Sequence, residues 1–419
     1  MKVGKGNSQL PPGPRGLPLV VYLPFLGRNL HRIVMDLAIV YGPIYKLWIG
    51  SKLYIIISSP TLVKEVVRDH DRKFANRNPT ITASTLTYRA SDTVFASYGS
   101  KWQILRKLFV HEVLSKANLD AFYAFRRDEM RKIIREIYNK DSKAIDIGDI
   151  AYVTMINMVS SMLWGGTTQG EKGTSLAAEF RVEVSQALQL LARPNVSDFF
   201  PMLARFDLQG VERDSKNPNS QQDMVIGGTN TTSSVVEWTM SELMLHQDVI
   251  TKLQEELAEV VGINNTVEEF HIQKLQYLQA IVKEALRLHP PAPLVIPHWT
   301  TQDCNVFLNV WAMHRDPQFW DNPSEFRPNR FLSEDTKLNY FGNNFHFLPF
   351  GSGKRICAGL PLAERMLMYV LATFVHMFNW KLPDGTNPDA LEKFGFVLEK
   401  ATPLVAIPTA RLPNLELYS

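Results

Sequence analysis

Hydrophobic positions follow two different periods along this chain. Residues 43–57 contain two short runs rich in aromatic and β-branched side chains, which suit a pleated sheet, and Leu53–Ile57 is the clearer of the two. Ser59 and Pro60 then supply the N-cap and first-turn proline that open a helix. Over residues 101–262 apolar positions recur almost throughout with the helical period. The pattern predicts a mainly α-helical protein with a smaller β-rich part.

The last third of the chain combines irregular and helical segments. After Pro290 the sequence is proline-rich and partly stranded, and one long helix returns after Cys357. Its apolar residues follow the spacing i, i+3, i+4, i+7, i+8, i+11, at Ala363, Met366, Leu367, Val370, Leu371 and Phe374. This spacing places them on one face and predicts a helix packed against the core.

Composition narrows the class of protein. The chain has 419 residues, of which 45% are hydrophobic and 21% charged, as in an ordinary globular protein. The formal net charge of +3 is too small to indicate a nucleic-acid partner. Cys304 and Cys357 are the only cysteines, so a disulfide framework is implausible and a reducing compartment is indicated. No apolar run approaches the roughly 20 residues of a membrane-spanning helix.

The candidate chemistry centres on a glycine-rich loop, residues 350–359, with the sequence Phe-Gly-Ser-Gly-Lys-Arg-Ile-Cys-Ala-Gly. A thiol in such a loop, followed by an apolar helix, is what a haem iron needs as its proximal ligand. Gly351 and Gly353 allow positive φ and close approach of the backbone to the sulfur. A lone cysteine in a glycine turn can also be purely structural.

Two further residues of the loop have chemical roles to offer. Arg355 can pair with a haem propionate through charge-assisted hydrogen bonds. Gly359 lets the following helix pack closely, with its N-terminal N–H groups near the sulfur. The whole stretch fits the pattern F-x-x-G-x-R-x-C-x-G at every fixed position, from Phe350 to Gly359.

On this pattern the chain resembles the cytochrome P450 superfamily of haem-thiolate monooxygenases. The resemblance implies the P450 fold, with haem b between a long distal helix and the proximal cysteine loop, and Cys357 as the axial ligand of the iron. Phe350, Arg355 and Gly359 would also contact the haem. Electrons would come from NADPH through an NADPH–cytochrome P450 reductase.

A second motif, Gly227-Gly228-Thr229-Asn230-Thr231-Thr232, lies inside a helical pattern. Paired glycines within a helix cost roughly 1 kcal/mol each relative to alanine, which makes sense if a large group lies against the backbone. The resemblance places this segment on the distal side, with the pattern [AG]-G-x-[DE]-T-[TS]. Gly227 would then lie near the haem, and Thr231 would hold dioxygen and a proton-carrying water. A chance run of small polar residues is the alternative.

Asn230 departs from the family pattern, which has an acid at this position. An amide donates and accepts hydrogen bonds but does not ionise. Proton delivery through a carboxylate would therefore be lost or rerouted through water. We expect normal binding of haem and substrate, with slower or less coupled oxygen activation, and we take Thr231 and Asn230 as the catalytic candidates.

Further residues resemble haem contacts. Trp102 and Arg106 stand four apart on a predicted helix, so both point the same way, and both resemble propionate contacts. A half-buried tryptophan on a solvated basic helix is the alternative. His298, after the proline-rich segment, is a third propionate candidate.

A structural cluster is also predicted from the sequence. Glu284 and Arg287 form an E-x-x-R pair on one helical face. Arg330, in the second family signature at residues 326–331, would join them in a network that holds the cysteine loop.

The substrate pocket should be apolar, and no charged residue stands out as an anchor, which argues against a strongly ionic substrate. By family position its walls include the 225–231 segment and Phe95, Leu294, Val295, Phe396 and Val397. Basic residues could form a positive face that attracts an acidic flavoprotein reductase, or could be ordinary solvated helix faces: Lys107, Arg126, Arg127, Arg131, Lys132 and Lys354.

The first residues of the chain and two unusually short segments indicate its organisation. Residues 1–14 read as a polar leader introduced for expression and a proline-rich hinge, and residues 15–419 as a single catalytic domain. Family members carry an N-terminal membrane anchor before such a hinge, which places the native form on the cytosolic face of the endoplasmic reticulum and leaves this form soluble or peripheral. Near 210–222 and 304–307 the sequence is shorter than the family pattern, so we expect that residues are missing there.

The sequence around these motifs resembles a plant microsomal member of the P450 superfamily, nearest the branch that oxidises sesquiterpenes and flavonoids. The expected function is hydroxylation of a hydrophobic specialised metabolite with O2. An O2-independent isomerase or lyase of the allene oxide synthase type is an alternative that Thr231 disfavours. A non-catalytic haem sensor is another, disfavoured by the intact 227–232 segment. A requirement for NADPH, reductase and O2 separates the three.

Overall fold

The structure is a computed structural model, and it describes residues 10–17, 21–27, 29–87, 89–140, 142–164, 184, 186–191, 193, 195–206, 209–210, 223–300, 303–333, 338–386 and 388–419. The leader Met1–Gln9 lies outside this part of the chain, as do residues 211–222, where the sequence predicts missing residues. The side chains of Val225 and Ile226, in the predicted pocket wall, are likewise outside it.

Helices dominate the described part of the chain, as the hydrophobic pattern predicts. The long ones are α1 (Leu30–Tyr41), α7 (Tyr123–Asn139), α8 (Ile147–Trp164), α12 (Asp223–Leu245), α13 (Gln247–Val260), α15 (Gln276–Leu288) and α17 (Leu360–Met377). The shorter ones are α2 (Pro60–Lys64), α3 (Asp71–Phe74), α4 (Ile81–Leu86), α5 (Ser100–Leu108), α6 (Lys116–Ala121), α10 (Val196–Phe199), α14 (Glu269–Ile272) and α16 (Val310–Met313). Single turns of 3₁₀ or π-helix connect several of them.

In the part of the chain that the structure describes, strands form three small sheets. The largest has the order β1 (Ile44–Ile49), β2 (Lys52–Ile57), β5 (Asn305–Leu308), β4 (His298–Trp299), with β2 and β5 parallel. A second consists of β3 (Ile145–Asp146), β9 (Val405–Ala410) and β6 (Phe378–Lys381), and a hairpin pairs β7 (Glu392–Lys393) with β8 (Glu399–Lys400). The two strands predicted within residues 43–57 are thus confirmed.

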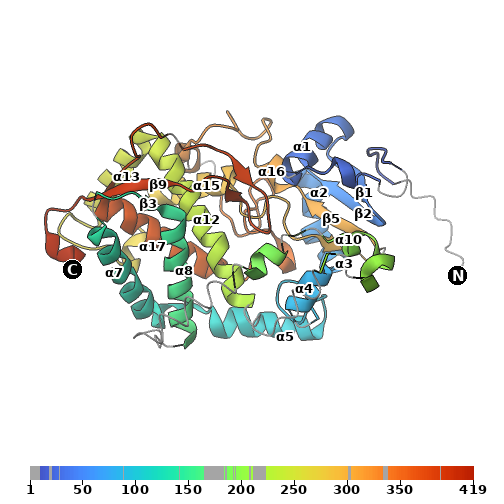
Figure 1. Ribbon diagram of the computed structural model, residues 1–419, viewed down its shortest axis with the longest axis horizontal. Helices are drawn as coiled ribbons and strands as arrows, with labels where there is room; N and C mark the ends of the chain where they lie inside the picture. Colours follow the sequence, from blue (N-terminus) through green and yellow to red (C-terminus); the bar gives the residue numbers. More distant parts are fainter. Residues whose placement is uncertain are drawn as a thin grey trace, which may run out of the picture.

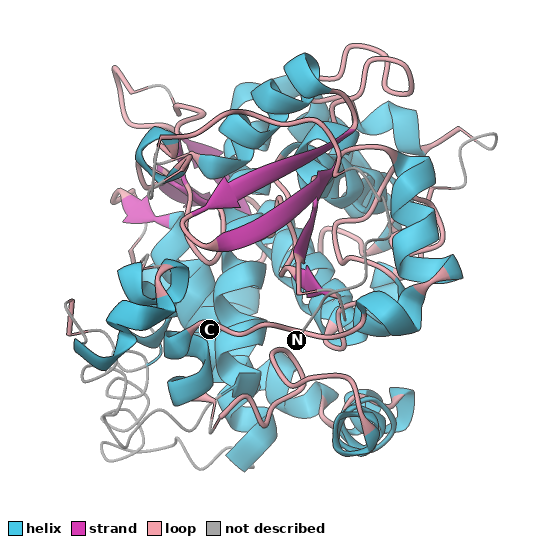
Figure 2. Cartoon of the chain, turned by 90° about the vertical axis from the view of Figure 1, so that its right-hand side faces the viewer, coloured by secondary structure: helices cyan, strands magenta, loops and turns pink. Residues whose placement is uncertain are grey.

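The largest sheet lies apart from most of the long helices. Helices α7, α8, α12, α13 and α17 gather at one end, and β1, β2 and β5 lie at the other with α1, α2 and α16 (Figure 1). Seen from that other end, the sheet lies in front of the helices (Figure 2). Within the described residues, no helix combines the length and apolarity needed to cross a membrane.

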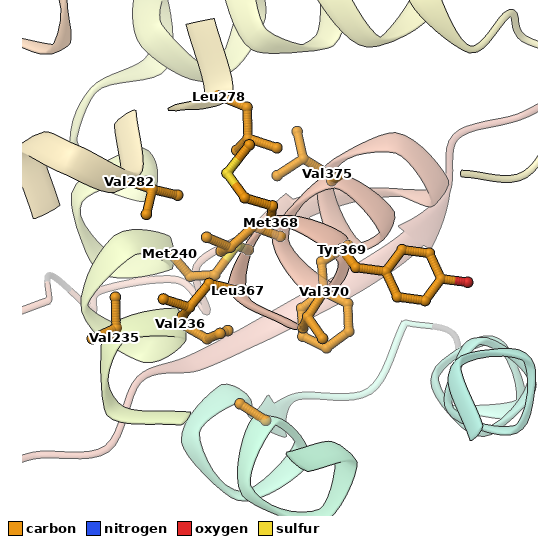
Figure 3. Close-up of a cluster of buried hydrophobic side chains, with 14 of the residues drawn as sticks. Val235, Val236, Met240, Leu278, Val282, Leu367, Met368, Tyr369, Val370 and Val375 are labelled. Carbon is orange, nitrogen blue, oxygen red and sulfur yellow. The ribbon is translucent and has the colours of Figure 1, made fainter. Parts of the chain in front are cut away.

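The main core forms where α12, α15 and α17 pack together. Val236 and Met240 of α12 and Leu278 of α15 meet Leu367 and Val370 of α17 (Figure 3), and all five are fully or almost fully buried. The predicted face of the last helix is therefore confirmed as buried from Met366 to Phe374, while Ala363 at its start is half-buried. This packing fixes α12, which carries the 227–232 segment, relative to α17, which begins just after the cysteine loop.

The predicted charge cluster forms at the edge of this core. Arg287 donates two parallel hydrogen bonds to Glu284, from Nε to Oε2 at 2.7 Å and from Nη2 to Oε1 at 2.8 Å, and both side chains are fully buried. Nε of Arg330 lies 3.0 Å from the same Oε1. Arg287 also donates to the carbonyls of His314, Pro323 and Glu325, so it ties α15 to the segment before the cysteine loop.

A buried acid on α12 makes a testable contribution to stability. Burial raises the pKa of Glu237 from 4.5 to about 7, although the Leu404 N–H donates to its carboxylate at 2.9 Å. An acid with a raised folded-state pKa favours folding below the unfolded pKa, and this contribution is lost as pH rises through the folded pKa. Glu237→Gln should therefore raise the thermal unfolding midpoint more at pH 8 than at pH 5. An equal shift at both pH values would contradict this assignment.

Candidate functional site

The cysteine loop has the backbone that its glycines suggest. Gly351 and Gly353 have φ of +71° and +63°, in the left-handed region that glycine tolerates best. A Cβ on Gly353 would lie 2.2 Å from the carbonyl oxygen of Val67, so no other residue fits there. Asp71, at the start of α3, accepts from the Lys354 N–H at 2.9 Å. Asp71 is a support of the loop that the sequence did not reveal.

The Cys357 thiol is accessible to solvent, yet protein surrounds it closely enough that burial raises its pKa. The backbone N–H groups of Gly359 and Leu360 and the positive charge of Arg106 act in the opposite direction and favour the thiolate. A Cβ on Gly359 would lie 3.8 Å from the sulfur. The N-terminus of α17 therefore faces the sulfur, as expected from the loop sequence.

Three arginines converge beside this loop. Arg355 is buried and donates to the carbonyls of Ala75 at 2.6 Å and Ala96 at 2.5 Å, while its buried Nη1 has no hydrogen-bond partner among the described residues. Burial and the nearby Arg106 lower the pKa of Arg355 to about 10. Burial, Arg355 and Arg106 lower the pKa of Arg77 to about 9. Asp71 and Asp92 offset part of this charge, but the convergence of three arginines is the electrostatic setting for an anionic ligand.

Arg77 is the member of this cluster that sequence reasoning missed. It stands in the Phe74–Arg77 segment, after α3, and donates to the carbonyls of Ile296 at 2.8 Å and Pro297 at 2.9 Å. No charge pattern marks it in the sequence, since its neighbours in the cluster come from α5 and the cysteine loop.

The other propionate candidates lie in the same place. Trp102 is buried, donates from Nε1 to the carbonyl of Thr93 at 2.9 Å, and stacks beneath Arg355 at 4.3 Å. Arg106 donates to the carbonyl of Ile356. His298, on β4, is buried beside Arg77, and its Nδ1 lies 2.9 Å from the carbonyl oxygen of Phe74. Burial, reinforced by Arg77, lowers the pKa of His298 to about 3, so this imidazole is neutral.

The distal candidates lie near the start of α12. The Thr231 hydroxyl donates to the Gly227 carbonyl at 2.7 Å, and both residues are partly or fully exposed. The side chain of Asn230 has a protein partner: its Nδ2 donates a hydrogen bond to Oε1 of Glu399 on β8 at 2.6 Å. Glu399 was not among the predicted site residues, because it is 169 positions away and no local motif marks it.

The five predicted pocket residues divide by their exposure. Phe95 and Phe396 are partly buried, with ring centroids 6.3 Å apart, and Val295 is partly buried with φ of +55°. Leu294 and Val397 are buried at 4% and 3% exposure, and Leu294 packs into the core behind the large sheet. Their contact with a substrate stays a prediction.

One expectation about the basic surface is wrong. Arg126 does not lie on a positive face: it is fully buried on α7, where it holds Glu269 through Nε at 2.6 Å. Lys132 pairs with Glu129 at 2.7 Å. On α5, by contrast, Ile104 and Leu108 are 59% and 51% exposed.

These residues fit a haem. Cys357 offers one solvent-accessible soft ligand, framed by N–H groups that stabilise its charged form. The arginine cluster, which includes the buried Nη1 of Arg355, is suited to bind the two carboxylates of haem b. In the Gly227–Thr231 stretch, Gly227 is exposed and Thr231 is partly exposed, and the position of this stretch opposite the cysteine loop stays a prediction.

Comparison with known proteins agrees with this arrangement. The model of the family described as "Cytochrome P450" matches residues 11–221 and 219–406. The chain is 34% identical to flavonoid 3',5'-hydroxylase of Campanula medium over 97% of this chain and 92% of that protein. It is 33% identical to carnosic acid synthase of Salvia pomifera over 97% and 94%. A zebrafish cytochrome P450 solved with progesterone has the same fold, with a TM-score of 0.77 at 23% identity over 90% of this chain and 99% of that one.

Proposed function

Because the chain belongs to the cytochrome P450 family, we propose that it is a haem-thiolate monooxygenase that hydroxylates a hydrophobic plant metabolite of the flavonoid or terpenoid class. The observation that carries this proposal is the accessible Cys357 beside three converging arginines, Arg355, Arg106 and Arg77. The relatives that hydroxylate flavonoids or make carnosic acid support the substrate class.

On this proposal the proximal residues hold the cofactor. Cys357 would ligate the iron, the N–H groups of Gly359 and Leu360 would favour its thiolate form, and Arg355, Arg106 and Arg77 would pair with the two propionates. Neutral His298 and the indole of Trp102 complete the polar rim. When bound, haem supplies the activation of O2 by which one oxygen atom enters the substrate and the other leaves as water.

The distal residues handle protons and substrate. Thr231 presents a hydroxyl that would hold a proton-carrying water in the site, and its hydrogen bond to the Gly227 carbonyl fixes the position of that hydroxyl. Phe95 and Phe396 form an apolar boundary that excludes water and orients a flat or hydrocarbon substrate.

The electron donor is an NADPH–cytochrome P450 reductase. Helix α5 offers the docking surface, with exposed Ile104 and Leu108 beside the basic Lys101 and Lys107. Charge attraction raises the association rate, while the apolar pair contributes contact area. The native protein is held on the cytosolic face of the endoplasmic reticulum by an N-terminal anchor.

The relatives also give information on the two segments, near 210–222 and 304–307, that are shorter than the family pattern. The alignment with the Campanula hydroxylase runs over 483 positions, although this chain has 419 residues, and the family match breaks at residues 219–221. These observations support absent residues near 210–222, while absent residues near 304–307 stay a prediction.

A binding-spectrum screen tests the substrate class. Flavonoids and terpenoids are added to the haem-loaded protein, and compounds that shift the haem band to the high-spin form are incubated with reductase and NADPH. We expect hydroxylated product from at least one such compound, in amounts that depend on NADPH. Product that forms equally well without NADPH and reductase would favour the isomerase or lyase alternative instead.

A further inference from the structure

The carboxylate missing from position 230 is present one hydrogen bond away. Nδ2 of Asn230 donates to Oε1 of Glu399 at 2.6 Å. A carboxylate can only accept hydrogen bonds, so the amide NH2 must face it. Asn230 directly precedes Thr231 on α12, which places the carboxyl group of Glu399 next to the residue where the family pattern carries its own acid.

The hairpin that carries Glu399 is fixed along α12. The Ser234 hydroxyl, one helical turn further on, donates to the Leu398 carbonyl at 2.8 Å in a buried position. Nζ of Lys400 lies 4.5 Å from the centre of the Trp238 ring. These contacts on either side hold Glu399 against Asn230.

Glu399 also has a route to solvent. Its side chain is 34% exposed, and Oε2 lies 3.8 Å from Nζ of Lys393, itself 69% exposed. Lys400 on its own strand and Glu237 on α12 are also near, and burial is the main cause of the raised pKa of Glu237, to which the charge of Glu399 adds. A proton can therefore reach Glu399 from bulk water without crossing the core.

We propose that Glu399 supplies the protons that the family pattern assigns to an acid at position 230, with Asn230 positioning its carboxyl group. The inference rests on the proposed monooxygenase function. In each transfer the Glu399 carboxyl gives one proton to water beside Thr231 and takes one back from solvent, so the residue is regenerated and one solvent proton is delivered. Glu399 is thus a proton-supplying residue that acts through water, and Asn230 is the residue that positions it.

Glu399→Gln separates proton supply from structure. The Gln Oε1 still accepts from Asn230, so the hairpin keeps its contact, but the side chain no longer carries a proton. With the screened compound that gives the largest spectral shift, we expect product per NADPH to fall at least about tenfold, less than the 10²–10⁴-fold typical of general acid catalysis because water still relays protons. Hydrogen peroxide release should rise, while haem content and the substrate-induced shift stay unchanged.

Exchanging the two side chains gives a sharper test. Asn230→Asp combined with Glu399→Gln restores one carboxyl and one amide with their positions reversed, and we expect it to recover most of the wild-type coupling. The matched control is Glu237→Gln, an acid-to-amide change on the same helix, which should leave coupling unchanged. Product formation by the wild type tests the proposed function. The product per NADPH of each variant relative to the wild type tests the role of Glu399.

A second measurement does not depend on turnover. In thermal unfolding, Asn230→Ala and Glu399→Ala should each lower the midpoint, and the double variant should lower it by less than their sum because the two share one hydrogen bond. Glu399→Gln should unfold near the wild-type midpoint. Wild-type coupling in Glu399→Gln, failure of the exchanged pair to recover, or additive midpoint shifts would each overturn the inference.

Discussion

Cys357→Ser is expected to abolish product formation. A serine hydroxyl stays protonated where the thiolate carries a charge, so the iron loses its anionic sulfur ligand and the electron donation that favours O–O cleavage. The N–H groups of Gly359 and Leu360, which face the sulfur, would then face a neutral group. The reduced carbon monoxide complex should lose the absorption band that marks thiolate-ligated haem, and the amount of haem retained after gel filtration should fall.

The chain provides a matched control for this change. Cys304, its other cysteine, is partly buried and lies 3.3 Å from the Thr300 hydroxyl. Cys304→Ser should keep the wild-type spectrum and turnover. A normal thiolate band in Cys357→Ser, or its loss in Cys304→Ser, would show that the wrong cysteine has been assigned.

Arg287→Met is expected to cause the largest loss of stability. The change leaves Glu284 charged in a fully buried position with only part of its hydrogen bonds, and removes the donor to three backbone carbonyls. Breaking a buried ion pair by removing one partner typically costs about 3–5 kcal/mol. We expect a strongly lowered denaturation midpoint, with haem loss following unfolding.

The control for Arg287 lies in the second signature motif. Arg327 pairs with Asp321 at 2.7 Å, but its side chain is 47% exposed. Arg327→Met should cost under about 1 kcal/mol, as for other surface ion pairs. Denaturant unfolding followed by circular dichroism measures both variants, and equal losses would contradict the role given to the buried pair.

Much of the fold was predictable because its signals are local. The glycine turn at Gly351–Gly353, the helix after Cys357 and the strands within residues 43–57 each follow from spacing and residue type over a few positions. The Glu284–Arg287 pair forms as expected because three positions on a helix bring two side chains together, whatever surrounds them.

The parts of the site that were missed depend on contacts between distant segments. Arg77 joins Arg355 and Arg106 only because α3, α5 and the cysteine loop meet in space. Glu399 reaches Asn230 from β8, so the replacement of the family acid and its substitute could not be connected from the sequence. Arg126 was misplaced for the same reason: its partner Glu269 lies 143 positions away, and burial of a basic helix residue has no sequence signal of its own.

Asn230 was correctly identified as unusual, but the expected consequence changes once Glu399 is considered. From the sequence, an amide at this position predicts impaired proton delivery. In the structure, Oε1 of Glu399 lies 2.6 Å from Nδ2 of Asn230, so strand β8 supplies a carboxyl group beside this position of α12. Efficient turnover by the wild type is therefore compatible with Asn230.

Incubation with isotopically labelled O2 tests the central claim most directly. The haem-loaded protein, reductase, NADPH and a compound selected by the binding-spectrum screen are combined under labelled O2 in ordinary water, and the product is analysed by mass spectrometry. A monooxygenase places one labelled oxygen atom in each product molecule. Product that carries no label, or that forms at the same rate without O2, would contradict the account.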